Sequence, residues 1–189
     1  TQPLRGTASS DNTNVVPSPA VTYNSDETSG SIQVTPIADA TGSAVITVTV
    51  EDGGSDGDLS TSCDNATTSQ TFTLTVNAVN DLPALAAISD FAIDEDAPEQ
   101  TVNLAGITAG GGETQPLRVT ASSDNTNLVP SPAVTYTSDE TSGSIQFPPI
   151  ADATGSAVIT VTVEDGGSDG DLSPSGDNAT TSQTFTLTV

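Results

Sequence analysis

The sequence has no histidine, lysine, tryptophan or methionine, and it contains one cysteine and two arginines among its 189 residues. Without histidine or lysine the chain cannot form a serine–histidine–aspartate triad, a histidine metal site or a lysine Schiff base. The single cysteine, Cys63, cannot form a disulfide within the chain. We therefore expect a protein that is not an enzyme, stabilised by packing and, where sites exist, by metal.

Positive charge is scarce, and the formal net charge is −23. Binding to nucleic acid or to an anionic membrane needs a basic patch, so both are excluded as partners. No apolar run approaches the roughly 20 residues that a membrane-spanning helix needs, so membrane insertion is not expected. Divalent cations, a salty environment or simple solubility remain as reasons for so many carboxylates.

An internal repeat organises the chain. The opening TQPLR returns at residues 114–118, and residues 1–76 match residues 114–189 at 69 of 76 positions. The pairs that differ are Gly6/Val119, Val15/Leu128, Asn24/Thr137, Val34/Phe147, Thr35/Pro148, Thr61/Pro174 and Cys63/Gly176. Residues 77–113 have no partner and are expected to open the second unit. We predict a first repeat at 1–79 without its N-terminal strands, a linker at 80–83 and a complete second repeat at 84–189.

Apolar residues alternate with threonine or other polar residues in short runs bounded by Gly, Pro, Asn and Asp, which is typical of strands with one buried face. No helical periodicity of comparable length competes. Strands are predicted at residues 88–94, 101–107, 116–121, 132–136, 143–147, 156–163 and 183–189. Seven strands in a unit of about 113 residues predict an all-β fold of tandem β-sandwiches.

The loop EDGGSDGD occurs at residues 51–58 and again, unchanged, at residues 164–171. Calcium prefers six to eight oxygen ligands from carboxylates, carbonyls and water, and this loop offers such ligands. The spacing is not that of an EF-hand. One hypothesis is a calcium site within each domain, and the other is a solvated loop that keeps the array soluble. The candidate ligands are Asp52, Asp56 and Asp58, with Asp165, Asp169 and Asp171 as the copy.

The segments ITVTVEDGG, QTFTLTV, NAVNDLP and FAIDED together resemble bacterial cadherin-like repeats, which are Ig-like Greek-key sandwiches of large surface or secreted proteins. The resemblance implies a calcium site at the domain junction around Asn80 and Asp81. Asp39 would approach from the first repeat, and Glu113 and Asp165 from the second. The acids Glu95, Asp96 and Asp152 would serve a following junction. The family's Asp-Arg-Glu triplet is absent from this sequence, and the corresponding loop holds one acid, Asp39 in the first repeat and Asp152 in the second.

These features predict a non-catalytic structural repeat of an extracellular or cell-surface protein, a stalk, matrix or surface-layer component stiffened by Ca²⁺. An adhesive or carbohydrate-binding module, or an accessory region of a larger secreted enzyme, is the alternative. Expected partners are neighbouring repeats of the same chain, other copies through strand exchange or lattice contacts, and glycans. Two sequences, Asn65-Ala66-Thr67 and Asn178-Ala179-Thr180, match the N-glycosylation pattern.

Overall fold

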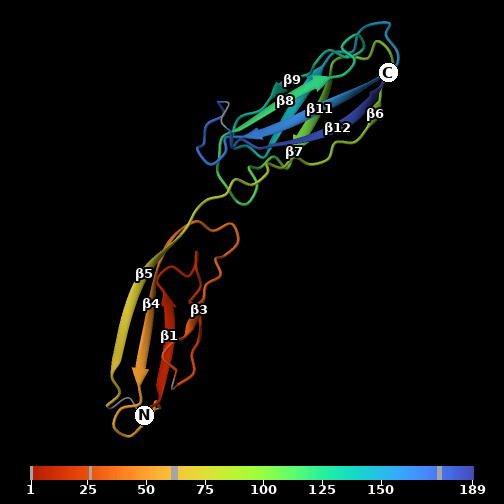
Figure 1. Cartoon of the computed structure of the whole chain (residues 1–189). Coiled ribbons are helices and arrows are strands. Elements are labelled where there is room, and N and C mark those ends of the chain that lie inside the picture. Colours follow the sequence, from red (N-terminus) through yellow and green to blue (C-terminus); the bar gives the residue numbers. More distant parts are fainter. Residues whose placement is uncertain (1, 26, 61–63, 174–175) are drawn as a thin grey trace. The chain divides into compact units, whose positions relative to one another are not determined.

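A computed structural model describes residues 2–25, 27–60, 64–173 and 176–189, so Cys63 lies outside the described residues. The described part of the chain is all β, with twelve strands and no helix (Figure 1). It accordingly contains no helix of the length and apolarity needed to cross a membrane. The all-β class predicted from the alternating runs is confirmed.

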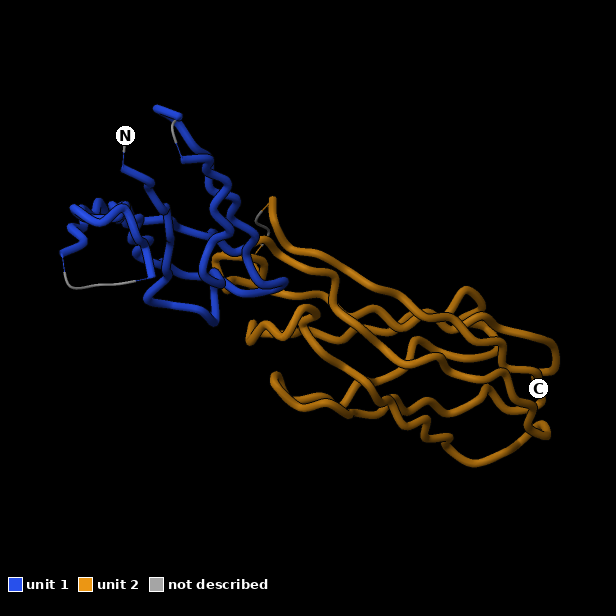
Figure 2. Tube along the Cα trace, turned by 90° about the horizontal axis from the view of Figure 1, so that it is seen from below, with its two compact units in different colours: residues 1–78 blue, residues 79–189 orange. Residues whose placement is uncertain are grey.

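The chain divides into two compact units, Thr1–Ala78 (unit 1) and Val79–Val189 (unit 2), coloured separately in Figure 2. Residues 80–83, predicted as a linker, belong to unit 2. Unit 1 contains a sheet in the order β1-β4-β5 and a two-stranded sheet β2-β3. Its strands are β1 (Leu4–Ser10), β2 (Ala20–Thr22), β3 (Ser31–Gln33), β4 (Gly42–Asp52) and β5 (Thr67–Val76).

Unit 2 is a sandwich of a four-stranded sheet, β6-β12-β11-β8, and a three-stranded sheet, β7-β10-β9. The chain changes sheet between β6 and β7, between β7 and β8, between β8 and β9, and between β10 and β11, which is Greek-key connectivity. Its strands are β6 (Phe91–Ala92), β7 (Gln100–Ala105), β8 (Leu117–Ser123), β9 (Ala133–Thr135), β10 (Ser142–Phe147), β11 (Ser156–Asp165) and β12 (Thr180–Thr188).

Strand β11 shows how the sequence forms the sandwich of unit 2. Its β-branched run places Ile159, Val161 and Val163 on one face, and all three are fully buried. The threonines between them lie on the opposite face and are partly exposed. β11 pairs antiparallel with β12 from Ser156↔Thr188 to Glu164↔Thr180, and on its other edge with β8. The register of β11 with β12 and β8 determines which residues lie next to one another at each end of unit 2.

The core of unit 2 includes residues from both sheets and from the segment before β8. Phe147 of β10 and Phe185 of β12 are almost completely buried, and so are Leu104 of β7 and Ile107 just after it. Phe185 stacks on Phe91 of β6 with ring centroids 5.7 Å apart. Unit 1 has a smaller buried cluster, consisting of Val15, Val16, Ala44 and Ile46.

Candidate functional site

The most constrained polar group of unit 2 is Asp165, the last residue of β11. Its relative exposure is 0%, and it is the single buried acid among the described residues. It is placed there by strand alternation, because Val161 and Val163 of the same face are core residues. Glu164 lies on the other face, where it pairs with Arg118. Asp165 is therefore held at the end of the core rather than in solvent.

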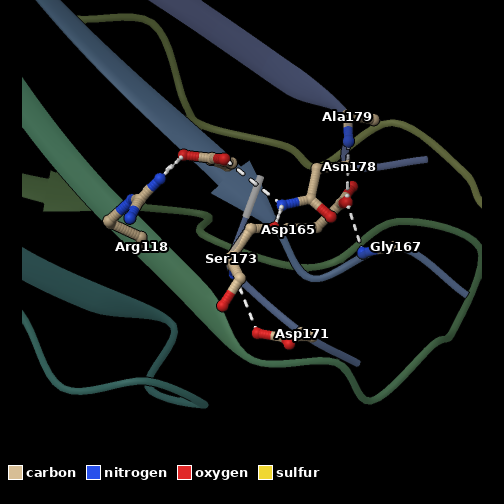
Figure 3. Close-up of polar contacts among 8 residues, drawn as sticks. Arg118, Asp165, Gly167, Asp171, Ser173, Asn178 and Ala179 are labelled. Carbon is tan, nitrogen blue, oxygen red and sulfur yellow. Dashed lines mark hydrogen bonds and ion pairs between the residues drawn. The ribbon is translucent and has the colours of Figure 1, made fainter. Parts of the chain in front are cut away.

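One oxygen of Asp165 is fully used by hydrogen bonds. The backbone N–H groups of Gly167 and Ala179 donate to Oδ1 over 3.0 and 2.9 Å, as Figure 3 shows. The side-chain amide of Asn80 donates to the same oxygen over 3.1 Å. The carboxylate therefore ties the start of the acid-rich loop to its end and to the segment that enters unit 2.

Asn80 is the centre of this group of polar residues. Besides Asp165, its Nδ2 donates to the backbone carbonyl of Asp177 over 3.1 Å. Its Oδ1 accepts a hydrogen bond from Nε2 of Gln115 over 2.6 Å. Both ends of the Asn80 amide are thus satisfied, and the side chain is fixed between three segments far apart in the sequence.

Glu113 and Gln115 complete the group. Oε2 of Glu113 accepts from Nε2 of Gln115 over 2.5 Å and from the backbone N–H of Asp81 over 3.3 Å. The turn before Glu113 passes close to Asp81, because a side chain on Gly111 would lie 1.9 Å from Asp81 Oδ2. We call Asn80, Asp81, Glu113, Gln115 and Asp165 the entry cluster.

Two buried oxygens of the entry cluster have no hydrogen-bond donor among the residues that the structure describes: Oδ2 of Asp165 and Oε1 of Gln115. A buried carboxylate without a compensating positive charge is energetically unfavourable. The chain cannot supply that charge, because it has no lysine and its two arginines pair with Glu51 and Glu164. Carboxylate and amide oxygens of this kind are suitable hard ligands for a divalent cation from solution.

The acids alone do not make a metal centre. Within the described residues, no three Asp, Glu, Cys or His side chains form a group that could hold a metal ion. A cation at the entry cluster would need the amide oxygen of Gln115 and backbone oxygens in addition to carboxylates. Calcium tolerates such mixed oxygen ligands and irregular geometry.

The other acids of the repeated loop act as turn-forming acceptors. Asp171 N–H donates to Asp169 Oδ1 over 2.9 Å, and Ser173 N–H donates to Asp171 Oδ1 over 2.8 Å. In unit 1 the same pattern links Asp56 to Asp58 and Asp58 to Ser60. These are local side-chain to backbone turns. The loop conformation therefore uses its carboxylates to satisfy its own N–H groups.

Hydrogen bonds lower the pKa values of three carboxyls in these loops, Asp52, Asp58 and Asp171. The hydroxyl and N–H of Ser60 lower the pKa of Asp58, and the N–H and hydroxyl of Ser173 lower that of Asp171. The pKa of Asp52 is lowered by the N–H groups of Ala66 and Gly54. Hydrogen bonds to the charged form favour that form. These hydrogen bonds thus stabilise the anionic forms of Asp52, Asp58 and Asp171.

Residues predicted for a following junction lie at the opposite end of unit 2. Asp152 N–H donates to Asp96 Oδ1 over 3.2 Å, and both residues have left-handed backbone, with φ of 58° and 60°. Glu95, Asp96 and Asp152 are all exposed. Asp39 of unit 1 is also exposed and has a φ of 59°. The structure therefore brings together Asn80, Asp81, Glu113 and Asp165, and separately Asp96 and Asp152.

Sequence reasoning missed two members of the polar network, Gln115 and Asp177. Gln115 is 9% exposed and links Asn80 to Glu113, whereas its copy Gln2 is exposed and donates to the carbonyl of Gly54. Oδ2 of Asp177 accepts from the N–H of Ser168 over 2.8 Å. Its copy Asp64 accepts likewise from Ser55. The sequence contained one signal for Asp177, because an aspartate precedes the asparagine of the glycosylation pattern in both copies of the repeat, as Asp64 and as Asp177.

The asparagines of both glycosylation patterns are engaged in hydrogen bonds. Asn178 Nδ2 donates to Glu164 Oε1 over 3.3 Å and to the carbonyl of Ser173 over 3.4 Å. Asn65 Nδ2 donates to Glu51 Oε1 over 3.2 Å, and Asn65 Oδ1 is buried. These nitrogens are the atoms that a glycan would modify, so attachment would compete with bonds that hold the loop.

Two glycines of the acid-rich loop offer a matched test of the Asp177 contact. Gly167 and Gly170 have φ of 61° and 70°, but a Cβ on Gly167 would lie 2.7 Å from the Asp177 carboxyl carbon, whereas one on Gly170 meets nothing within 4 Å. We predict that Gly170→Ala costs about 1 kcal/mol of backbone strain. Gly167→Ala should cost about 1–2 kcal/mol more, because it displaces the Asp177 carboxylate from Ser168. Urea unfolding compares the two, and equal costs would contradict the contact.

No protein-family model matches the chain, and no curated protein matches it. Among solved structures, it is similar to the S-layer protein rSbsC(31-844), with 16% identity and a TM-score of 0.38 over 96% of this chain and 20% of that chain. Domains 4–9 of surface layer protein SbsC give 18% identity and a TM-score of 0.40 over 97% and 21%. Extracellular cadherin domains 3–6 of protocadherin gamma B2 give 15% identity and a TM-score of 0.48 over 98% and 41%. The chain thus spans about a fifth of the two S-layer structures and less than half of the protocadherin structure.

Proposed function

We propose that the chain is a non-catalytic structural repeat of an extracellular or cell-surface protein, and that Ca²⁺ at the entry cluster stiffens the start of unit 2. The observation that carries the calcium proposal is the pair of buried oxygens without donors, Asp165 Oδ2 and Gln115 Oε1. The structural role rests on the tandem repeat, whose copies share 69 of 76 compared positions. Copies this similar suit an extended array, in which each unit performs the same task.

The chain's own residues define what the ion would do. Asn80 and Asp81 belong to the segment that leads from unit 1 into unit 2, Glu113 and Gln115 precede β8, and Asp165 ends β11. The candidate ligand oxygens are Asp165 Oδ2, Gln115 Oε1, the carboxylate of Glu113 and backbone oxygens beside them. A divalent cation would offset the mutual repulsion of these acids. It would thereby fix the entering segment against the end of the sandwich.

Thermal unfolding in calcium, in magnesium and in chelator tests this function. Each unit has one tyrosine, Tyr23 in unit 1 and Tyr136 in unit 2. In a Tyr23→Phe background, tyrosine fluorescence therefore reports unit 2 alone. A ligand that binds only the folded state raises its stability, by about 2.7 kcal/mol at a hundredfold excess over Kd. We expect calcium to raise the melting temperature of unit 2 more than magnesium does.

The matched control is the same substitution at the equivalent loop position of unit 1. Asp165→Asn should abolish the calcium response of Tyr136, because it removes a ligand charge. Asp52→Asn should leave that response intact, because Asp52 caps the loop of unit 1 through Gly54 and Ala66. An unchanged melting temperature at millimolar calcium would refute the calcium proposal, and so would an equal rise in the Asp165→Asn variant.

A further inference from the structure

Unit 1 exposes an apolar face whose counterpart within unit 2 is buried. Phe72 is 42% exposed, whereas its counterpart Phe185 is 1% exposed, and Val50 is 42% exposed against 0% for Val163. The difference is specific to this face, because Val45 on the other face of β4 is 37% exposed and its copy Val158 is 38% exposed. The same residues thus pack in one unit and face solvent in the other.

The exposed face contains a groove of about 660 Å³. Its apolar lining residues are Leu4, Val21, Tyr23, Ile32, Val48 and Val50. The counterparts in unit 2 all belong to or pack against the main core cluster, together with Leu85, Leu104 and Ile107. The segment from Ala84 to Thr108, which includes β6 and β7, therefore fills in unit 2 the space that is open in unit 1.

Two strand edges are open beside the groove. In unit 2, β6 pairs parallel with β12 through Leu187↔Phe91, and β7 pairs antiparallel with β10 through Ile145↔Val102. The corresponding strands of unit 1 are β5 and β3, and each lies at an edge of its sheet among the described strands. Open edges next to an apolar groove accept an added strand.

We propose that this face of unit 1 docks a strand-donating segment with the apolar pattern of residues 84–108, equivalent to the segment that opens unit 2. In unit 2 the segment runs straight into β8 through Glu113 and Gln115, so a segment joined before β1 can follow the same path. It adds one parallel strand to β5 and one antiparallel strand to β3, and its apolar side chains fill the groove.

A second copy of this chain is a poorer occupant for a reason of stoichiometry. Each chain has one such segment and two frameworks that can accept it, so exchange between copies always leaves one framework open. The core differences also favour unit 2 as the acceptor. Unit 1 has the smaller residue at three core positions, Gly6, Val15 and Val34, where unit 2 has Val119, Leu128 and Phe147. Those changes leave the segment of this chain less well packed on unit 1.

The test is to extend the full chain with a second copy of residues 79–113 joined before Thr1. The readout is amide hydrogen exchange of β3 and β5. The control extension has the same length, with serine in place of the apolar residues equivalent to Leu85, Phe91, Ile93, Leu104 and Ile107. We expect the apolar extension to slow exchange in β3 and β5 at least tenfold relative to the control extension. In the apolar extension, Phe72→Ala should then lower the melting temperature by as much as Phe185→Ala does.

Two results would overturn the proposal. One is equal exchange in β3 and β5 with the apolar and the control extensions. The other is a concentration-dependent dimer of the unextended chain, detected by sedimentation, in which β3 and β5 are already protected. That second result would identify another copy of the chain as the occupant.

Discussion

Phe185→Ala should destabilise unit 2 by about 3–5 kcal/mol, the usual cost of removing a buried aromatic side chain. Phe185 is 1% exposed and stacks on Phe91, so its removal leaves a cavity between the two sheets. Phe72→Ala should cost less than about 1 kcal/mol, because 42% of Phe72 is already exposed to water. The two phenylalanines occupy equivalent positions of the repeat, so the sequence around each is the same.

The measurement is urea unfolding followed by tyrosine fluorescence. The Tyr23→Phe background reports unit 2 for the Phe185 variant, and Tyr136→Phe reports unit 1 for the Phe72 variant. Similar losses of unfolding free energy in the two units would contradict the difference in burial. Such a result would mean that the apolar face of unit 1 is covered in solution.

Asp165→Ala should destabilise unit 2 by about 2–4 kcal/mol in the absence of calcium. It removes the acceptor of three hydrogen bonds and leaves the backbone N–H groups of Gly167 and Ala179 without this partner, while the Asn80 amide keeps its bond to the Asp177 carbonyl. An unsatisfied buried donor costs about 1–3 kcal/mol. Chemical unfolding in chelator, monitored at Tyr136, measures this loss.

Two further variants separate the contributions at this position. Asp165→Asn keeps an oxygen in the place of Oδ1 and removes a buried charge, so in chelator it should cost much less than Asp165→Ala. Asp52→Ala in unit 1 should also cost less, because Asp52 is half-buried and accepts two of these bonds, from Gly54 and Ala66. If Asp165→Asn and Asp165→Ala were equally destabilising in chelator, hydrogen bonding through Oδ1 would not be the main role of Asp165.

The long strands could be predicted because their alternation reflects burial. The run predicted at residues 156–163 is β11, and the observed strand extends to Asp165 because Glu164 and Asp165 still pair with β8. The prediction at residues 88–94 was less successful. Only Phe91–Ala92 forms a strand, since pairing with β12 is limited to two residues. An apolar run shows which side chains pack but not how far the backbone ladder extends.

The candidate site could be predicted in part. Asn80, Asp81, Glu113 and Asp165 were named from the sequence, and the structure places them in one network. Gln115 was not named, because a single glutamine has no pattern that separates it from surface residues. Only the tertiary fold shows that Gln115 is buried against Asn80 while its copy Gln2 is exposed. The repeat also concealed the difference in burial between Phe72 and Phe185, which arises from residues outside the repeated segment.

Calcium binding at the entry cluster can be observed directly by a calcium titration followed by ¹H–¹⁵N NMR. We expect saturable shifts of the Asn80 side-chain amide, the Gln115 side-chain amide and the Gly167 backbone amide. Magnesium should produce smaller shifts, and the Asp165→Asn variant should show none at these groups. Unchanged resonances of the entry cluster at millimolar calcium would contradict the claim, as would shifts spread evenly over the acidic loops of both units.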